Sequence, residues 1–74
     1  MNVIQAKQKA INEFEDYMTA NHYTKGTLYI AVSRESGEAV IARTLNAALS
    51  ANLMWVFEVS NCYGEHPVAV LCES

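Results

Sequence analysis

The sequence predicts an α+β fold of two layers, in which a four-stranded, mostly antiparallel sheet carries two helices packed on one face. Three observations predict this class. Apolar residues recur at helical spacing in two segments and at every second position in four others, in the order α-β-β-α-β-β. Short polar segments containing Gly separate the strands of each adjacent pair, as in hairpins. The chain has 74 residues, 51% of them apolar, and a net charge of −3, so we expect a single small domain over residues 1–74 and no intrinsic disorder.

Residues 2–22 are predicted to form the first and longer helix. Asn2 is followed by Gln5 three positions later, a pattern typical of a capping box at the start of a helix. Gly26 offers a stop after the polar end of the segment. The buried face should consist of the apolar residues that recur every three or four positions, namely Val3, Ala6, Ala10, Ile11, Phe14, Tyr17 and Met18.

Two strands joined by a tight connection are expected next. Residues 34–38 contain Gly37 and suit a hairpin that leads into a second strand over residues 38–43, so the two strands should pair antiparallel. The first strand, residues 27–34, alternates between one face with Leu28, Ile30 and Val32 and another with Tyr29, Ala31 and Ser33.

The second half of the chain is predicted to contain a short helix and two further strands. Thr44 is a good N-cap for a helix over residues 45–53. Residues 54–60 alternate as a strand, and Pro67 marks the start of a last strand over residues 68–72. The stripe of the short helix that we expect to be buried is Leu45, Ala48, Leu49 and Leu53.

The sheet face turned away from the helices is expected to be apolar as well. The face toward the helices should hold Leu28, Ile30, Val32, Trp55, Phe57, Val59, Val68 and Val70. An antiparallel sheet with one face in water normally alternates apolar with polar residues, so an apolar second face indicates that a partner covers it. The residues expected on that face are Tyr29, Ala31, Ile41 (or Val40), Val56, Ala69 and Leu71.

The charge pattern argues against nucleic acid and membrane as partners. Five Lys and Arg residues are scattered along the chain, whereas phosphate binding relies on clustered basic residues. No apolar run approaches the ~20 residues that a membrane helix needs. The first residues lack the pattern of a secretory signal, so we expect a cytoplasmic protein with reduced cysteines.

Three groups of residues are candidates for chemistry, and each has a simpler interpretation. Cys62 and His66 lie close enough in sequence to form a nucleophile and its base, but no residue nearby could orient the histidine. His22 and Cys72 could join them around zinc, although the spacing is poor. The carboxylates of the first helix, such as Glu13 and Asp16, are expected to be solvated. We therefore expect no catalytic residue, no metal and no cofactor.

The interpretation that fits these observations best is a non-enzymatic module that occupies the surface of a partner protein, as a small inhibitor or regulatory adaptor. A homodimer through the apolar sheet face is equally compatible with the pattern. By analogy alone, compact acidic chains of this kind occur among inhibitors of host systems that bacteriophages and mobile elements encode. Two alternatives remain: a small cytoplasmic thiol enzyme or redox protein using Cys62 and His66, and a weak binder of single-stranded nucleic acid through Tyr29 and Arg34.

Overall fold

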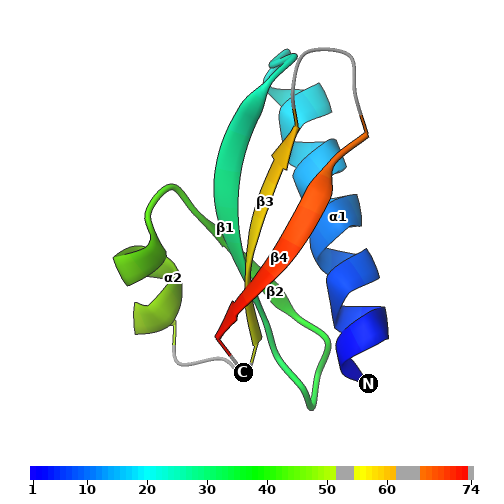
Figure 1. The fold of residues 1–74 in the computed structure, drawn as a ribbon, viewed down its shortest axis with the longest axis vertical. Coiled ribbons are helices and arrows are strands. Elements are labelled where there is room, and N and C mark those ends of the chain that lie inside the picture. The colour runs from blue at the N-terminus through cyan, green and yellow to red at the C-terminus, as the bar shows by residue number, and fades with distance from the viewer. Residues whose placement is uncertain (52–54, 62–65, 74) are drawn as a thin grey trace.

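A computed structural model describes residues 1–51, 55–61 and 66–73 of the chain (Figure 1). Six elements follow one another in the predicted α+β order. They are helix α1 (Val3–Ala20), strands β1 (Gly26–Val32) and β2 (Ala39–Ala42), helix α2 (Leu45–Ser50), and strands β3 (Trp55–Asn61) and β4 (Val68–Glu73). The fold class and the order α-β-β-α-β-β are therefore confirmed.

The four strands form one open sheet in the order β2-β1-β3-β4, and every neighbouring pair is antiparallel. Strands β1 and β2 form one hairpin and β3 and β4 form the other, as predicted. The connection through α2 carries the chain from edge strand β2 to β3, which pairs with β1 along all seven residues of each strand. Strands β2 and β4 are consequently the two edges of the sheet.

Helix α1 begins at the capping box that the sequence predicts. The backbone N–H of Gln5 donates to Oδ1 of Asn2, and the backbone N–H of Asn2 donates to Oε1 of Gln5, both at 2.9 Å. These two hydrogen bonds satisfy donors that a helix start otherwise leaves unpaired.

Helix α1 runs to Ala20 and is terminated by His22 and not by Gly26, so that part of the prediction is wrong. The N–H of Tyr23 donates to the carbonyl of Met18 at 2.9 Å, and the N–H of His22 donates to the carbonyl of Thr19 at 3.2 Å. His22 has a φ of 58°, which makes this a Schellman motif with a non-glycine residue in the left-handed position. Gly26 is instead the first residue of β1.

The main core lies between α1 and one face of the sheet. Ala6 and Ala10 have no exposed surface, and their small side chains let the helix axis approach the strands closely. Phe14 and Met18 continue this face toward the end of the helix. The strands contribute Leu28, Ile30, Val32, Trp55, Phe57, Val59 and Ala69 to the same cluster.

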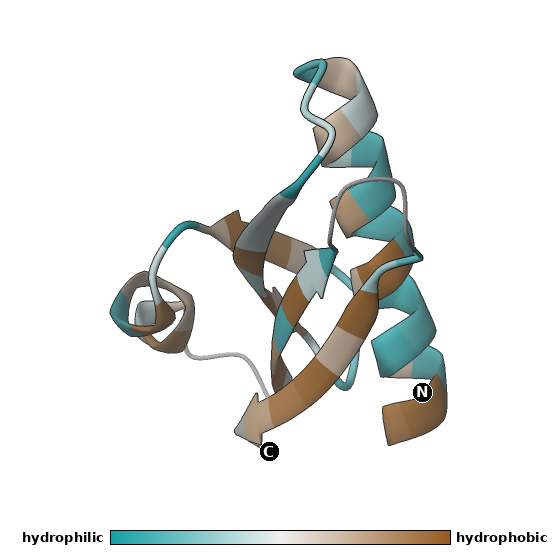
Figure 2. Cartoon of the chain, turned by 45° about the horizontal axis from the view of Figure 1, so that its top comes forward, coloured by the Kyte–Doolittle hydropathy of each residue, from teal (hydrophilic) through white to brown (hydrophobic). Residues whose placement is uncertain are grey.

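Helix α2 packs on the opposite face of the sheet, so the prediction that both helices share one face is wrong. Ala48 is fully buried in a second cluster with Ala31 and Val56, separate from the cluster under α1. In Figures 1 and 2, α2 and α1 lie on opposite sides of the sheet. The physical reason is that β1 and β3 carry apolar residues on both faces, and each face needs cover. The sequence pattern could not assign the short helix to one of them.

The predicted buried stripe of α2 is only partly confirmed. Ala48 is buried, but Leu45 and Leu49 are 38% and 41% exposed. Leu53 lies outside the described residues. Ala48 is the one residue of this six-residue helix that is buried, so the exposed leucines lie at the margin of its contact with the sheet.

Neither helix, in the part of the chain that the structure describes, is long and apolar enough to cross a bilayer.

Candidate functional site

The six residues predicted to form a docking face do not share one exposed surface. Ala31 and Val56 do lie on the face opposite α1, but both are buried beneath α2. Tyr29 also lies on that face and is half-buried. Helix α2 therefore covers much of the surface that we expected a partner to cover.

The other three predicted residues belong to the face that packs against α1, and their placement on the outer face is wrong. Ile41 pairs with Ile30 in the β1–β2 register and packs against the main core. Ala69 pairs with Val59 and is 5% exposed within that core, and Leu71 pairs with Phe57.

The β3–β4 register places every residue of the last strand on the face opposite to the one we expected. Val68 and Val70, which we expected to face the helices, lie on the outer face. The residues from Val68 to Cys72 are all apolar, so alternation along this strand carried no information about its faces. Only the pairing with β3 decides them.

Within the sheet, most of the large apolar side chains that remain exposed lie on edge strand β4, whereas a separate exposed apolar group, Met1, Val3 and Ile4, lies at the start of α1. Val68 and Val70 are 62% and 55% exposed, and Leu71 on the other face is 42% exposed. Figure 2 shows β4 as a largely hydrophobic strand at the margin of the sheet. Among the described residues, α1 contacts β4 but α2 does not. We take this edge, Val68–Cys72, as the candidate site.

The backbone of β4 presents unpaired hydrogen-bonding groups along this edge. The N–H of Ser33 donates to the carbonyl of Glu38 at 2.8 Å, and the carbonyl of Ser33 accepts from the N–H of Gly37 at 3.1 Å, so both backbone groups of Ser33 bond toward the second arm of the first hairpin. Antiparallel ladders alternate hydrogen-bonded and non-bonded pairs, and each residue bonds to one side only. The observed registers extend this alternation from β2 across β1 and β3 to β4. It follows that the backbone groups of Val68 and Val70 bond to β3. The N–H and C=O groups of Ala69 and Leu71 therefore point outward, away from the sheet.

A polar pair separates this edge from the part of the outer face that α2 covers. The hydroxyl of Tyr29 donates to Oε2 of Glu58 at 3.0 Å, and Glu58 is the register partner of Val70. Hydrogen bonding to the Glu58 carboxylate is the largest cause that raises the pKa of Tyr29. The charge of Glu58, burial and the charge of Cys72 add to it.

The residues proposed for thiol or metal chemistry are not brought together in the described part of the chain. Cys62 lies outside the described residues, so the suggested pair with His66 falls partly outside them too. His22 ends α1 and is exposed, and Cys72 is an exposed free thiol on β4. Within residues 1–51, 55–61 and 66–73, no three His, Cys, Asp or Glu side chains gather as a metal site requires.

The acidic residues of α1 and the suggested nucleic-acid contacts are also separate. Glu13 pairs with Lys9 at 2.9 Å on the surface of the helix. The guanidinium of Arg34 lies 5.1 Å from the ring centroid of Trp55, which belongs to the core under α1. Tyr29 points to the opposite face, so it and Arg34 do not form one stacking surface.

Comparison with protein-family models, with curated proteins and with solved structures finds no match to this chain. The candidate site therefore rests on geometry.

Sequence reasoning missed the β4 edge as a site, although one signal pointed to it. The last strand follows a proline and contains five consecutive uncharged, apolar residues. Edge strands normally carry a charge or a proline among their central residues. The lack of either in Val68–Cys72 could have indicated an edge left open for pairing.

Proposed function

We propose that this protein is a non-enzymatic protein-binding module that adds an extended segment of another protein to its sheet at β4. By occupying that segment, it acts as an inhibitor or a regulatory adaptor. The observation that supports this proposal is the long, apolar, exposed edge formed by Val68–Cys72.

The edge has the two elements that strand addition uses. The outward N–H and C=O groups of Ala69 and Leu71 offer main-chain hydrogen bonds to an added strand, which supply affinity for any extended chain. The side chains of Val68 and Val70 on one face and Leu71 on the other would contact alternate residues of that strand. Strand addition therefore involves both faces of the edge.

Charge favours a different protein over a second copy as the occupant. From Thr44 to the last residue the sequence contains three Glu and no Lys or Arg. The expected partner segment is accordingly apolar with basic residues, since opposite charges across an interface favour association. Pairing of β4 with β4 of a second copy would bring like charges together. An origin in a phage or mobile element, with a host protein as target, stays a prediction that rests on analogy.

The decisive experiment removes one outward backbone donor without changing any side chain. A recombinant thioester of residues 1–61 can be ligated to a synthetic peptide of residues 62–74, because residue 62 is a cysteine. The peptide carries N-methyl-Leu71, and the control is the same ligation with ordinary Leu71. Each product captures proteins from nuclease-treated lysate, and the partner is then titrated as a purified protein. We expect N-methylation to weaken binding about tenfold or more, since a buried acceptor of the partner loses its donor.

A matched pair of side-chain variants tests the same proposal. Val70→Lys places a charge on the β4 edge, whereas Val40→Lys places it on the same sheet face at the opposite edge, where Val40 is 41% exposed. A partner retained by Val40→Lys but lost by Val70→Lys supports strand addition at β4. A partner that binds both variants and the N-methyl protein equally would overturn it. Self-association that these changes abolish would assign the edge to a homodimer.

A further inference from the structure

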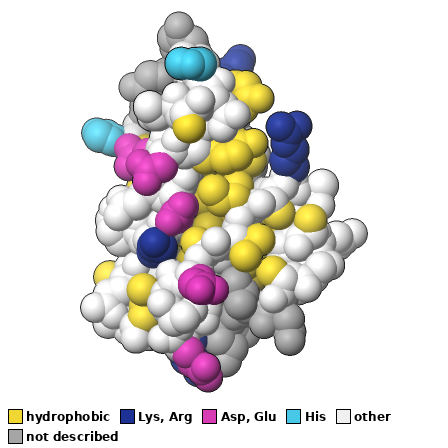
Figure 3. Space-filling model, turned by 180° about the vertical axis from the view of Figure 1, so that it is seen from behind, with side chains coloured by type: hydrophobic (Ala, Val, Ile, Leu, Met, Phe, Trp, Pro, Cys, Tyr) yellow, Lys and Arg dark blue, Asp and Glu magenta, His cyan; other side chains and the backbone are white. Residues whose placement is uncertain are grey.

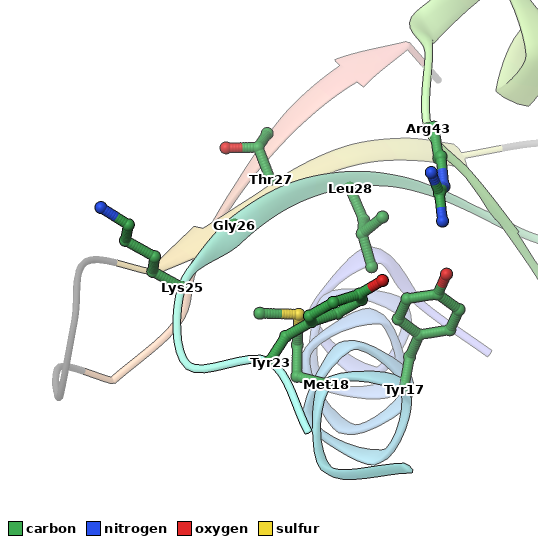
Figure 4. A pocket seen from close by; sticks show the side chains of 8 residues that line it. All are labelled: Tyr17, Met18, Tyr23, Lys25, Gly26, Thr27, Leu28 and Arg43. Carbon is green, nitrogen blue, oxygen red and sulfur yellow. The ribbon is translucent and has the colours of Figure 1, made fainter. Parts of the chain in front are cut away.

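A recess lies between the end of α1, the start of β1 and the residue that follows β2 (Figure 4). Its volume is about 260 Å³. Met18 and Leu28, each 6% exposed, contribute its apolar surface. Figure 3 shows this region from behind as part of a hydrophobic band beside α1, with a Lys or Arg side chain flanking the band on the side away from the helix. We call this recess, which Tyr17, Met18, Tyr23, Lys25, Gly26, Thr27, Leu28 and Arg43 line, the tyrosine groove.

The polar groups of the tyrosine groove converge from three parts of the chain. Tyr17 comes from the last turn but one of α1, Tyr23 follows the Schellman motif, and Arg43 follows β2. In Figure 4 the hydroxyls of both tyrosines and the guanidinium of Arg43 point toward the same space. The two rings are tilted by 38° with centroids 6.4 Å apart, so they form two walls of one recess.

The groove is positively charged within a negatively charged protein. Two of the five basic residues of the chain, Lys25 and Arg43, line it, and none of its lining residues is acidic. Neither cation forms an ion pair with a carboxylate of the described residues. Hydrogen bonding to the hydroxyl of Tyr17 is the largest cause that raises the pKa of Arg43, and a guanidinium is positively charged in proteins in any case. A guanidinium has five N–H donors, so contact with tyrosine hydroxyls leaves others available.

We propose that the tyrosine groove binds a small organic anion, a carboxylate or phosphate attached to a single planar apolar ring. The oxyanion accepts hydrogen bonds from Arg43 and the hydroxyls of Tyr17 and Tyr23, and Lys25 adds charge. The ring lies on Met18 and Leu28, beside the two tyrosine rings. This site is independent of the β4 edge.

Chemistry and size both select this class of ligand. The planar fork of arginine fits carboxylate and phosphate with paired hydrogen bonds. A volume of about 260 Å³ is slightly smaller than typical small-molecule sites, which are roughly 300 Å³ and above. One ring with one acidic group fits it, whereas a larger cofactor would not. The apolar surface favours a ring over a free inorganic ion.

The test uses four probes that separate charge from ring. Phenyl phosphate and benzoate carry both features, benzyl alcohol carries the ring alone, and inorganic phosphate carries the charge alone. Each is titrated into the full-length ¹⁵N-labelled protein, and the Arg43 Nε–H, the backbone amides and the methyl group of Met18 are followed by NMR. We expect saturable shifts confined to the groove, with a dissociation constant of about 1 mM or lower for the ringed anions. Whether phenyl phosphate or benzoate binds more tightly identifies the preferred oxyanion.

Arg43→Gln is the variant that decides the proposal, and Arg34→Gln is its matched control. Both arginines are at the surface, but Arg34 lies against Trp55 away from the groove. We expect Arg43→Gln to weaken binding of the ringed anions about tenfold or more and Arg34→Gln to leave it unchanged. If Arg43→Gln changes the NMR spectrum throughout the protein, and so disturbs the fold, Lys25→Gln provides the same comparison with a smaller expected loss of binding affinity. Benzyl alcohol binding as tightly as benzoate, equal binding by both arginine variants, or no saturable shift up to about 10 mM would each overturn the proposal.

Discussion

The two edges of the sheet differ in length, charge and cover. Strand β2 has four residues, lies between the charged residues Glu38 and Arg43, and contacts both helices. Strand β4 has six residues, is apolar from Val68 to Cys72, and contacts α1 but not α2 within the described chain. Proteins usually protect sheet edges by shortening, charging or covering them. The β2 edge has all three protections, whereas β4 is longer, uncharged from Val68 to Cys72 and covered by one helix only. This asymmetry leads us to place partner binding at β4.

Helix α2 covers the sheet near β2, and Ala48 is its buried residue. Disrupting the packing of Ala48 should have the largest effect on the free energy of unfolding. Ala48 of α2 is fully buried against Ala31 and Val56. We expect Ala48→Asp to lower the free energy of unfolding by about 2–3 kcal/mol, because the carboxylate cannot stay buried and α2 must detach. Urea denaturation followed by Trp55 fluorescence measures the change.

The neighbouring Ala47 provides the control for that experiment. It is exposed on the same helix, so Ala47→Asp should change stability by less than about 0.5 kcal/mol. Equal losses in the two variants would mean that α2 contributes helix propensity and not cover. In that case, covering the outer face with α2 would not stabilise the protein, and the part under α2 would not differ in stability from the part beside β4.

The short β2 edge also depends on the turn that precedes it. Gly37 has a φ of 74°, in the left-handed region that favours glycine. A Cβ added there would lie 3.2 Å from Cε of Met1, the end of a flexible side chain that can move. We therefore expect Gly37→Ala to cost about 1 kcal/mol, mainly from backbone strain.

Gly26 is the matched position for this comparison. An added Cβ would lie at an ordinary 3.4 Å from Cε of Met18, and Gly26 has no positive φ. Gly26→Ala should be neutral to within about 0.5 kcal/mol in the same thermal or urea unfolding measurement. If the two variants were equally stable, the hairpin turn would not restrain the β2 edge.

The hydrogen bond between Tyr29 and Glu58 lies on the outer face between the part that α2 covers and the β4 edge. We expect it to have the smallest effect on stability and a defined pH dependence. The Glu58 carboxylate raises the pKa of Tyr29 by hydrogen bonding. The folded state then holds the phenol proton more tightly than the unfolded state. The stability from this pair is fully present below the ordinary tyrosine pKa of about 10 and is lost as pH rises through the higher folded value.

Glu58→Gln tests this pH dependence. With ¹³Cζ-labelled tyrosine, NMR should place the pKa of Tyr29 lower in Glu58→Gln than in the parent protein, because the negative charge is gone. The decrease in the free energy of unfolding as pH rises through the pKa of Tyr29 should also be smaller in Glu58→Gln than in the parent protein. A pKa that does not move would contradict the role of Glu58 at this boundary.

Much of the secondary structure was predictable because local patterns specify it. Asn2 and Gln5 formed the expected capping box, and the alternation of Leu28 and Ile30 with Tyr29 and Ala31 matched the observed faces of β1. The errors came where local patterns are ambiguous. His22 ended α1 although a glycine was available downstream, because the Schellman hydrogen bonds compensate for a left-handed non-glycine residue.

The site was harder to predict because it depends on which face and which edge each strand occupies. The tyrosine groove gave no sequence signal at all, since Tyr17, Tyr23 and Arg43 have no spacing that relates them. They meet only because α1, the turn after it and the end of β2 converge. The β4 edge gave a compositional signal, but its meaning required the strand order.

The sequence by itself determined the number and order of the elements, the α1 cap, and the two hairpins. These follow from periodicity and turn residues within a few positions of one another. Tertiary structure alone decided that α2 covers the face opposite α1, that Ala69 is buried while Val70 is exposed, and that β4 is an open edge. The reason is that a strand apolar on both faces satisfies either register equally, so its orientation is chosen by the strand beside it and by what remains to be covered.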